Sequence, residues 1–178
     1  EGISILANGI KYNEGDNIVI ADQEHQSILF PWIAAHERYG VELKVVKSIG
    51  KDVDVDGLIA AIDEHTRVVA VSSVQFSTGF RADLKKLGAA CKEKGVIFCV
   101  DGIQALGRLK IDVQEMNIDW LAAGGNKGLL ATLGAGFVYC SDRIVKDIIP
   151  CYAGYQSTVS HVSPPSITTE FDHLEWYP

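Results

Sequence analysis

The sequence predicts an α/β domain of three layers, in which a mostly parallel β-sheet lies between helices. Two repeating patterns support this fold class. Short apolar runs with little polar alternation recur along the chain, as expected for strands that are covered on both faces. Between these runs, apolar residues return every three or four positions, which is typical of one face of a helix. Regular alternation of the two patterns indicates a parallel sheet whose strands are joined by helices.

Each element follows from its local pattern. The expected strands are, in chain order, 17–22, 41–47, 67–73, 96–101, 120–123 and 136–140. The expected helices have apolar faces built from Ile28, Leu29, Trp32 and Ile33, from Val55, Leu58, Ile59 and Ile62, and from Leu84, Leu87 and Cys91. Pro31 is tolerated near the first turn of its helix. A short helix is expected from Asp142 onward, after the last strand.

Composition limits the class of protein. The chain has 178 residues, of which 47% are hydrophobic and 22% charged, so it can form one globular domain with a core of good size. Its net charge of −7 disfavours nucleic acid or an anionic membrane as the main partner. No apolar run is long enough to span a bilayer. The four cysteines form no C-x-x-C pair and no two histidines have metal-ligand spacing, so we expect a reduced, cytoplasmic protein without a metal site.

The patterns also divide the chain. Residues 1–150 carry the alternation and are expected to form the α/β domain. Past Pro150 the sequence is rich in Gly, Ser, Thr and Pro, so residues 151–178 are expected to be a connecting segment toward a further domain. Residues 1–6 resemble a helix that is entered midway, with no capping residue before it, so we expect the domain to be truncated on its N-terminal side.

Two of the expected strands lead to opposite charges. The apolar run 96–100 ends directly on Asp101, and the strand that begins at Trp120 leads through glycines to Lys127. Because the carboxyl ends of parallel strands line one crevice, these two side chains are predicted to share a site. An aldehyde cofactor requires such a pair, since a lysine can form an imine with it and a carboxylate can keep its pyridine nitrogen protonated. A plain buried ion pair would satisfy the same two positions.

Longer motifs extend this pair across the chain. They are EHQS at 24–27 with Pro-Trp at 31–32, DGIQALG at 101–107, IDV at 111–113, DWLA at 119–122 and GNK at 125–127. In this order they resemble the class V aminotransferases, a family of pyridoxal-phosphate enzymes that includes cysteine desulfurases and selenocysteine lyases. The resemblance implies the large domain of a pyridoxal-phosphate-dependent transferase fold.

The resemblance also implies an activity. The protein is expected to bind pyridoxal 5'-phosphate and to act on a small amino acid through an imine with the lysine, as a transferase or lyase. Desulfuration of cysteine, or the matching reaction of selenocysteine, is the first expectation. Transamination and epimerisation of an amino acid are the alternatives within the family. Relatives usually build the site across a homodimer interface, so a homodimer is expected for the full-length protein.

Matched to the family residue by residue, five side chains acquire roles. Lys127 matches the imine lysine, whose freed amine can move the proton at the substrate's α-carbon. Asp101 matches the carboxylate that pairs with the pyridine nitrogen. Gln104 matches the residue beside the ring's phenolic oxygen, and His25 matches the histidine that stacks on the ring and can move protons. Gln75 occupies the position where relatives usually carry asparagine.

The turn before the lysine departs from the family pattern. Relatives commonly have serine and histidine where this chain has Gly124 and Asn126, so phosphate binding would depend on the Asn126 amide, on backbone N–H groups or on a helix N-terminus. We therefore expect the isolated chain to be inactive. Two other readings stay open. One is a different α/β nucleotide or flavin domain, favoured if Lys127 lies on the surface. The other is a fragment or degenerate domain that keeps only the fold.

Overall fold

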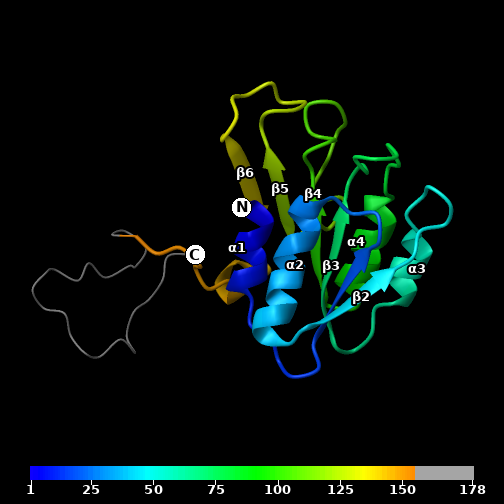
Figure 1. The fold of residues 1–178 in the computed structure, drawn as a ribbon, viewed down its shortest axis with the longest axis vertical. Coiled ribbons are helices and arrows are strands. Elements are labelled where there is room, and N and C mark those ends of the chain that lie inside the picture. Colours follow the sequence, from blue (N-terminus) through cyan, green and yellow to red (C-terminus); the bar gives the residue numbers. More distant parts are fainter. Residues whose placement is uncertain (155–178) are drawn as a thin grey trace, which may run out of the picture.

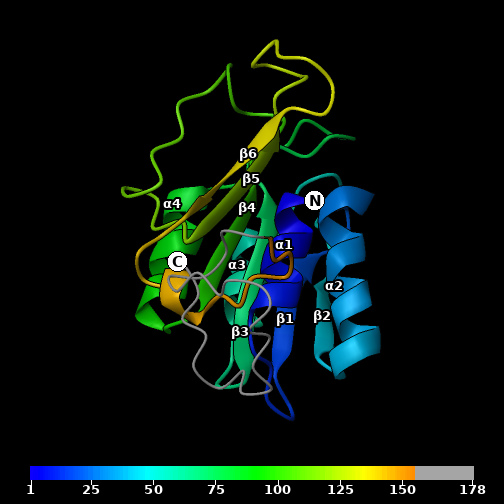
Figure 2. The same ribbon diagram turned by 90° about the vertical axis from the view of Figure 1, so that its left-hand side faces the viewer.

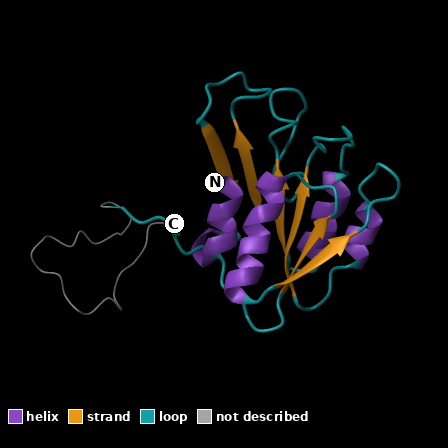
Figure 3. Cartoon of the chain, in the orientation of Figure 1, coloured by secondary structure: helices purple, strands orange, loops and turns teal. Residues whose placement is uncertain are grey.

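The computed structural model describes residues 1–154, and within them the chain forms a six-stranded sheet with helices on both faces (Figure 1 and Figure 3). The strands are β1 (Asn17–Ala21), β2 (Glu42–Val46), β3 (Thr66–Ser72), β4 (Ile97–Asp101), β5 (Trp120–Gly124) and β6 (Gly136–Cys140). The helices are α1 (Gly2–Gly9), α2 (Gln26–Tyr39), α3 (Val55–Ala60), α4 (Leu84–Glu93) and the 3-10 turn η1 (Val145–Asp147). The predicted fold class is confirmed, and each strand ends within one residue of its expected bounds.

The order of strands in the sheet is β2-β1-β3-β4-β5-β6, and only the pair of β5 with β6 is antiparallel. The chain moves outward from β1 to β2 and then crosses back to enter β3 on the other side of β1. Helices α2 and α4 therefore leave the carboxyl ends of β1 and β3 on opposite faces of the sheet (Figure 2). In open α/β sheets, ligands usually bind at the crevice between two such strand ends.

The inner strands contribute to a core on each face. On β3, Val68 and Ala70 belong to the cluster that α1 and α2 cover, whereas Val69 and Val71 belong to the cluster under α3 and α4. Trp32 is fully buried in the first of these clusters. A strand with two apolar faces has no need of polar alternation, which explains the pattern seen in the sequence.

Two local expectations differ from the structure. Pro31 lies at the sixth position of α2, inside the helix, because the helix begins at Gln26 with His25 as its N-cap. A proline there has no N–H to donate to the carbonyl four residues earlier. The segment after Asp142 forms only the 3-10 turn η1. The uncapped start expected for α1 agrees with Glu1, whose side chain makes no cap hydrogen bond.

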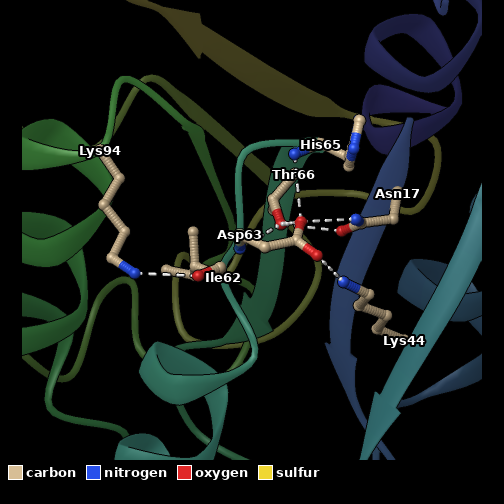
Figure 4. Close-up of polar contacts among 7 residues, drawn as sticks. All are labelled: Asn17, Lys44, Ile62, Asp63, His65, Thr66 and Lys94. Atoms are coloured by element: carbon tan, nitrogen blue, oxygen red, sulfur yellow. Dashed lines mark hydrogen bonds and ion pairs between the residues drawn. The ribbon is translucent and has the colours of Figure 1, made fainter. Parts of the chain in front are cut away.

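Asp63 connects three strands near the amino ends of the sheet (Figure 4). Its carboxylate accepts hydrogen bonds from the Asn17 side chain at 2.8 Å, the Thr66 hydroxyl at 3.0 Å and the His65 backbone N–H at 3.1 Å, and it pairs with the Lys44 ammonium. Asn17 begins β1, Lys44 lies in β2 and Thr66 begins β3. The bond from Lys44, helped by the other donors, holds the pKa of Asp63 well below its usual range.

The expected boundary between the α/β domain and the connecting segment lies at residue 150, only four residues before the end of the described part of the chain. The expected connecting segment 151–178 therefore lies almost entirely outside the described residues. Up to residue 154, no helix is both long enough and apolar enough to cross a bilayer.

Candidate functional site

Asp101 is held rigidly at the carboxyl end of β4. It is the last residue of the strand, lies between Ser72 and Ala122 in the sheet register, and is 8% exposed. Its Oδ1 accepts a hydrogen bond from the Ile103 backbone N–H at 2.9 Å. Its carbonyl oxygen accepts two more, from the Ser73 backbone N–H and the Ser73 hydroxyl, each at 2.9 Å. Both the backbone and one carboxylate oxygen are thus fixed by neighbouring loops.

A cavity of about 450 Å³ opens beside this carboxylate. Its lining includes Glu1, Gly2 and Ile3 of α1, Asp101 and Ile103 after β4, Gly124 and Asn126 after β5, and Phe137 and Val138 of β6. Helix α1 packs tightly here, because a Cβ on Gly2 would lie 2.7 Å from side-chain atoms of both Ala122 and Val138. One cavity therefore joins the first residues of α1, the loop after β4 and the turn after β5 at the buried carboxylate of Asp101.

Lys127 lies in the turn after β5 and is partly buried. Within residues 1–154 its ammonium makes no hydrogen bond or ion pair. Burial raises the pKa of the Asp101 carboxyl, while the Ile103 N–H and the nearby charges of Lys127 and His25 act to lower it without cancelling the rise. Lys127 and His25 are therefore both close enough to act on the Asp101 carboxylate, although neither of them lines the cavity.

Two glycines place the lysine turn against the loop that follows Asp101. A Cβ on Gly107, whose φ is +82°, would lie 2.2 Å from the Gly128 carbonyl oxygen. A Cβ on Gly128 would lie 2.2 Å from the Leu106 carbonyl oxygen. The two loops therefore meet backbone against backbone, at a distance that only glycine permits. Sequence reasoning did not assign these glycines a role.

His25 caps α2 and contacts an aromatic ring. Its Nδ1 accepts a hydrogen bond from the Ser27 backbone N–H at 3.1 Å, so the neutral ring carries its proton on Nε2. The Phe76 ring meets the imidazole edge to face, with the ring centroids 4.7 Å apart and the planes at 87°. The imidazole is thus oriented by one contact from the first turn of its own helix and one from the loop after β3.

The three predicted amide side chains have different surroundings. Gln104 is partly buried in the turn after Asp101, and Asn126 lies exposed on the cavity lining. The Asn126 Oδ1 is 2.9 Å from the place that a Cβ on Gly124 would occupy. Gln75 is only 1% exposed and does not line the cavity, and its Nε2 donates to Glu24 at 2.7 Å.

Glu24 is the residue near the site that sequence reasoning missed. It was noticed only as part of the motif around His25, yet it is 8% exposed and accepts hydrogen bonds from Ser72 and Gln75. Burial raises the pKa of its carboxyl, and the charge of Asp101 raises it further. The available signal is an acidic residue directly before His25, in the short loop between a buried strand and a helix.

Residues 1–154 contain no cluster of metal-ligating side chains, and three of their four thiols have raised pKa values. Among residues 1–154, no group of three or more His, Cys, Asp or Glu side chains could hold a metal ion. All four cysteines are free. Burial raises the pKa of the Cys91 thiol to about 12, and it also raises the pKa values of Cys99 and Cys140. A buried thiol with a raised pKa is a poor nucleophile.

The chain forms an α/β sheet in which a carboxylate ends β4 and a lysine lies in the turn after the neighbouring strand β5. The comparison with known proteins gives the family. The family model described as aminotransferase class V matches residues 1–174. The chain therefore belongs to the class V aminotransferase family.

Individual relatives agree with this assignment. The chain is 35% identical over 171 residues to a probable cysteine desulfurase of Methanothermobacter thermautotrophicus, which covers 96% of this chain and 42% of that protein. It matches the apo structure of a cysteine desulfurase from Thermococcus onnurineus NA1 with a TM-score of 0.86 and 26% identity, over 99% of this chain and 42% of that one. A variant of C-DES with glycine covalently linked to its PLP cofactor matches with a TM-score of 0.80 and 26% identity, over 88% and 43% of the two chains. The chain thus spans less than half the length of these proteins.

Proposed function

We propose that this chain is the large domain of a pyridoxal-phosphate-dependent enzyme that acts on an amino acid, with desulfuration of cysteine or selenocysteine as its chemistry. The observation that carries the proposal is Asp101, a buried carboxylate that lines an open cavity and senses the charge of Lys127. The cysteine desulfurases among the relatives support the choice of reaction. Because the chain spans less than half of those relatives, the activity is proposed for the longer protein.

The residues around the cavity fit pyridoxal phosphate. Within the described residues, the Asp101 carboxylate accepts a hydrogen bond only on Oδ1, from the Ile103 backbone N–H. Its Oδ2 is therefore available to a protonated ring nitrogen. The Asn126 amide lies on the same cavity and can donate to a phosphate group. Gly124 contributes no side chain to that end. When bound, the cofactor supplies an electron sink for bond breaking at the substrate's α-carbon.

Four of the predicted side chains would then have defined tasks, and Gln75, which does not line the cavity, is not among them. Lys127 would hold the cofactor through its ε-amine and would move the proton at the α-carbon of the substrate when that amine is free. Asp101 would keep the ring nitrogen protonated. His25 has its Nε2 left for a proton because Nδ1 is bonded to the Ser27 N–H. Gln104 would donate its amide N–H to the ring's phenolic oxygen.

Other activities use much of the same machinery. Transamination and epimerisation need the same Lys127 and Asp101, so they are the alternatives within the family. Cys91, Cys99 and Cys140 are unsuited as desulfurase nucleophiles because burial raises their pKa values, so a reactive thiol would have to come from another position. A non-catalytic role is favoured by Gly124, and a different nucleotide domain is disfavoured by the partly buried position of Lys127.

The wider setting is also a proposal. A homodimer is proposed from the family relationship, and a reducing, cytoplasmic location is supported by four free cysteines. We place the boundary of the cofactor-binding domain at 150, after η1, with 151–178 leading toward a second domain.

The test is to locate the cofactor on the full-length protein. The purified protein should show the visible band of lysine-bound pyridoxal phosphate, and borohydride should trap the adduct on the peptide that contains Lys127. The Lys127→Ala variant should lose the trapped adduct. Lys94→Ala is the matched control, because Lys94 is another lysine whose ammonium contacts only the body of the protein, at the Ile62 carbonyl. A trapped adduct on a different lysine, or none at all, would refute the proposal.

The reaction is tested separately on the same protein. With cysteine as substrate, desulfuration yields alanine and a sulfane or sulfide product, whereas transamination yields a keto acid from the substrate and an aminated second substrate. Alanine formation that depends on Lys127 supports the desulfurase assignment. Keto acid formation without alanine would replace it with transamination, and loss of chirality alone would replace it with epimerisation.

A further inference from the structure

A buried carboxylate spans the crevice where the strand order reverses. Glu24 lies in the loop between β1 and α2. Its carboxylate oxygens accept hydrogen bonds from the end of β3 and the loop after it, on the other side of the crevice. Its Oε1 accepts from the Ser72 backbone N–H at 2.8 Å and from the Gln75 Nε2 at 2.7 Å, and its Oε2 accepts from the Ser72 hydroxyl at 2.5 Å. Within residues 1–154 it has no cationic partner. Three donors on two oxygens suit the ionised form.

The same two loops make a second contact one residue further along. Glu24 bonds to Gln75, and the next residues, His25 and Phe76, pack edge to face at 4.7 Å. The two loops are therefore held together by two adjacent contacts, one polar and one aromatic. Because the polar contact is buried, it fixes the distance between the loops, and the orientation of the His25 ring follows from it.

The hydrogen bonds continue from Glu24 toward Asp101. Ser72 binds Glu24, and its neighbour Ser73 donates both its backbone N–H and its hydroxyl to the Asp101 carbonyl. Ser72 and Asp101 are also partners in the register of β3 and β4. One end of β3 thus connects the loop that carries His25 to the strand that carries Asp101.

We propose that Glu24 is a positioning residue, whose carboxylate, bound to Ser72 and Gln75 across the crevice, fixes the place of His25 relative to Asp101. The inference has a structural part, that Glu24 positions His25, and a functional part, that this positioning supports activity. The functional part rests on the proposed function, because the relative placement of His25 and Asp101 matters to chemistry only if the site holds pyridoxal phosphate. The structural part is independent of the proposed function. At metal sites, loss of the partner that orients a ligand typically costs about 10- to 100-fold in affinity or activity, and we expect a loss of similar size here.

The structural part is tested by the signal of His25 in the full-length protein. The Phe76 ring shifts the NMR resonance of the His25 Cε1–H, which is observed in protein labelled with ¹³C at histidine and stripped of cofactor. Glu24→Ala should move this resonance toward the position of an unstacked histidine. Glu24→Gln should restore it, since the amide has the same shape and the Ser72 hydroxyl can turn to accept from it.

Asp22→Ala is the matched control. Asp22 lies in the same loop and its carboxylate also accepts from a serine backbone N–H and hydroxyl, those of Ser48, but it does not contact β3. It should leave the His25 resonance in place. If Glu24→Ala does not fold, Gln75→Ala removes one of the three bonds and should shift the resonance in the same direction. An unchanged resonance in the folded variant, or an equal change in Asp22→Ala, overturns the proposal.

The functional part is measured on the same variants loaded with cofactor. Glu24→Ala should keep the borohydride-trapped adduct on Lys127 while kcat/KM falls about 10- to 100-fold, and Glu24→Gln should recover most of the loss. Full activity of Glu24→Ala with a displaced His25 would overturn the functional part. If the parent protein traps no cofactor, the proposed function itself has failed, and the His25 resonance still decides the positioning role.

Discussion

Asp101 is buried, and burial disfavours the charged form of a carboxyl group. The role proposed for Asp101 nevertheless requires it to act as an anion. Burial raises the pKa of its carboxyl, and the nearby Lys127 and His25 offset only part of that rise. A cationic ring nitrogen would supply the missing charge at short range. If the proposed cofactor binds here, its pyridinium would gain electrostatic energy from the Asp101 carboxylate.

This leads to a prediction for Asp101→Asn in the full-length protein. Cofactor should remain attached to Lys127, but abstraction of the α-proton should slow by 10²-fold or more, about 3 kcal/mol, because an amide cannot hold the ring nitrogen protonated. Single-turnover kinetics with α-deuterated substrate measure this step directly. Asp22→Asn, in a loop at the same edge of the sheet, is the control and should change the rate little. An unaltered rate in Asp101→Asn would contradict the role.

Leu130 lies three residues after Lys127, and its backbone conformation leads to a second prediction. It has φ +56° and is 90% exposed, so it holds a left-handed conformation without burying its side chain. Such a conformation costs an L residue roughly 1–2 kcal/mol, while asparagine adopts it readily. Leu130→Asn should therefore raise the free energy of unfolding by about 1 kcal/mol in denaturant titrations. Leu133→Asn, which is 84% exposed and has no positive φ, should have little effect. Equal changes in the two variants would argue against backbone strain.

At the scale of elements, the contact between the loop after β4 and the turn after β5 determines where Lys127 stands. Gly107 has a positive φ, and a Cβ added to it would lie 2.2 Å from the Gly128 carbonyl oxygen. Gly134 also has a positive φ, +84°, but a Cβ added to it would meet no atom within 4 Å. Gly107→Ala should destabilise the protein by about 2–3 kcal/mol more than Gly134→Ala, because overpacking adds to the same backbone strain. Chemical denaturation of both variants measures the difference. Similar losses would show that the loops can separate without penalty.

The elements themselves were well predicted because apolar periodicity determines them. The four inner strands β1, β3, β4 and β5 are buried runs bounded by turns, while the edge strands β2 and β6 are more exposed, and the ends of all six follow from the apolar pattern. The start of α2 did not follow, because its N-cap is the His25 imidazole, which is not among the usual capping residues, and Pro31 was consequently placed too near the first turn. The sequence could not show whether the segment after Asp142 forms an α-helix or the 3-10 turn η1, because over so few residues both have the same sequence pattern.

At the scale of the whole molecule, the two edges of the sheet respond to acid in opposite directions. At the carboxyl edge, the pKa values of Glu24 and Asp101 are raised, so protonation of these groups relieves an unfavourable burial of charge. At the amino edge, the pKa of Asp63 is lowered, so its contribution to stability is complete above the ordinary carboxyl pKa near ~4 and is lost as the pH falls toward its lowered value.

We therefore expect Asp63→Asn to destabilise the protein clearly at pH 7 and progressively less below pH ~4, where the native protein also loses this contribution. Urea unfolding of the two proteins across this range gives the difference at each pH. The control is Asp142→Asn, an exposed carboxylate outside the cluster, which should shift the curve little at any pH. A difference that is independent of pH would mean that the Asp63 charge does not stabilise the fold.

Only part of the candidate site could be predicted from the sequence. Asp101 and Lys127 could be named as candidates because each comes after a buried strand, and the carboxyl ends of parallel strands lie at the same edge of the sheet. The bond between Glu24 and Gln75 joins loops 51 residues apart, and no local pattern reports which polar groups of two loops face each other. The contact of Gly107 with Gly128 was hidden for the same reason, since glycine appears in turns for many causes.

The strand order has a consequence for the time course of folding. Every neighbouring pair in the sheet joins strands that follow one another in the chain, except β1 with β3. The nascent chain can therefore form a unit of β1 and β2 while β3 to β6 are still being synthesised. Glu24 and His25 belong to the first unit, and Asp101 and Lys127 belong to the second. The site is complete only when the seam between the two units closes, so an arrest during synthesis would leave a partly folded chain that exposes the edge of β1.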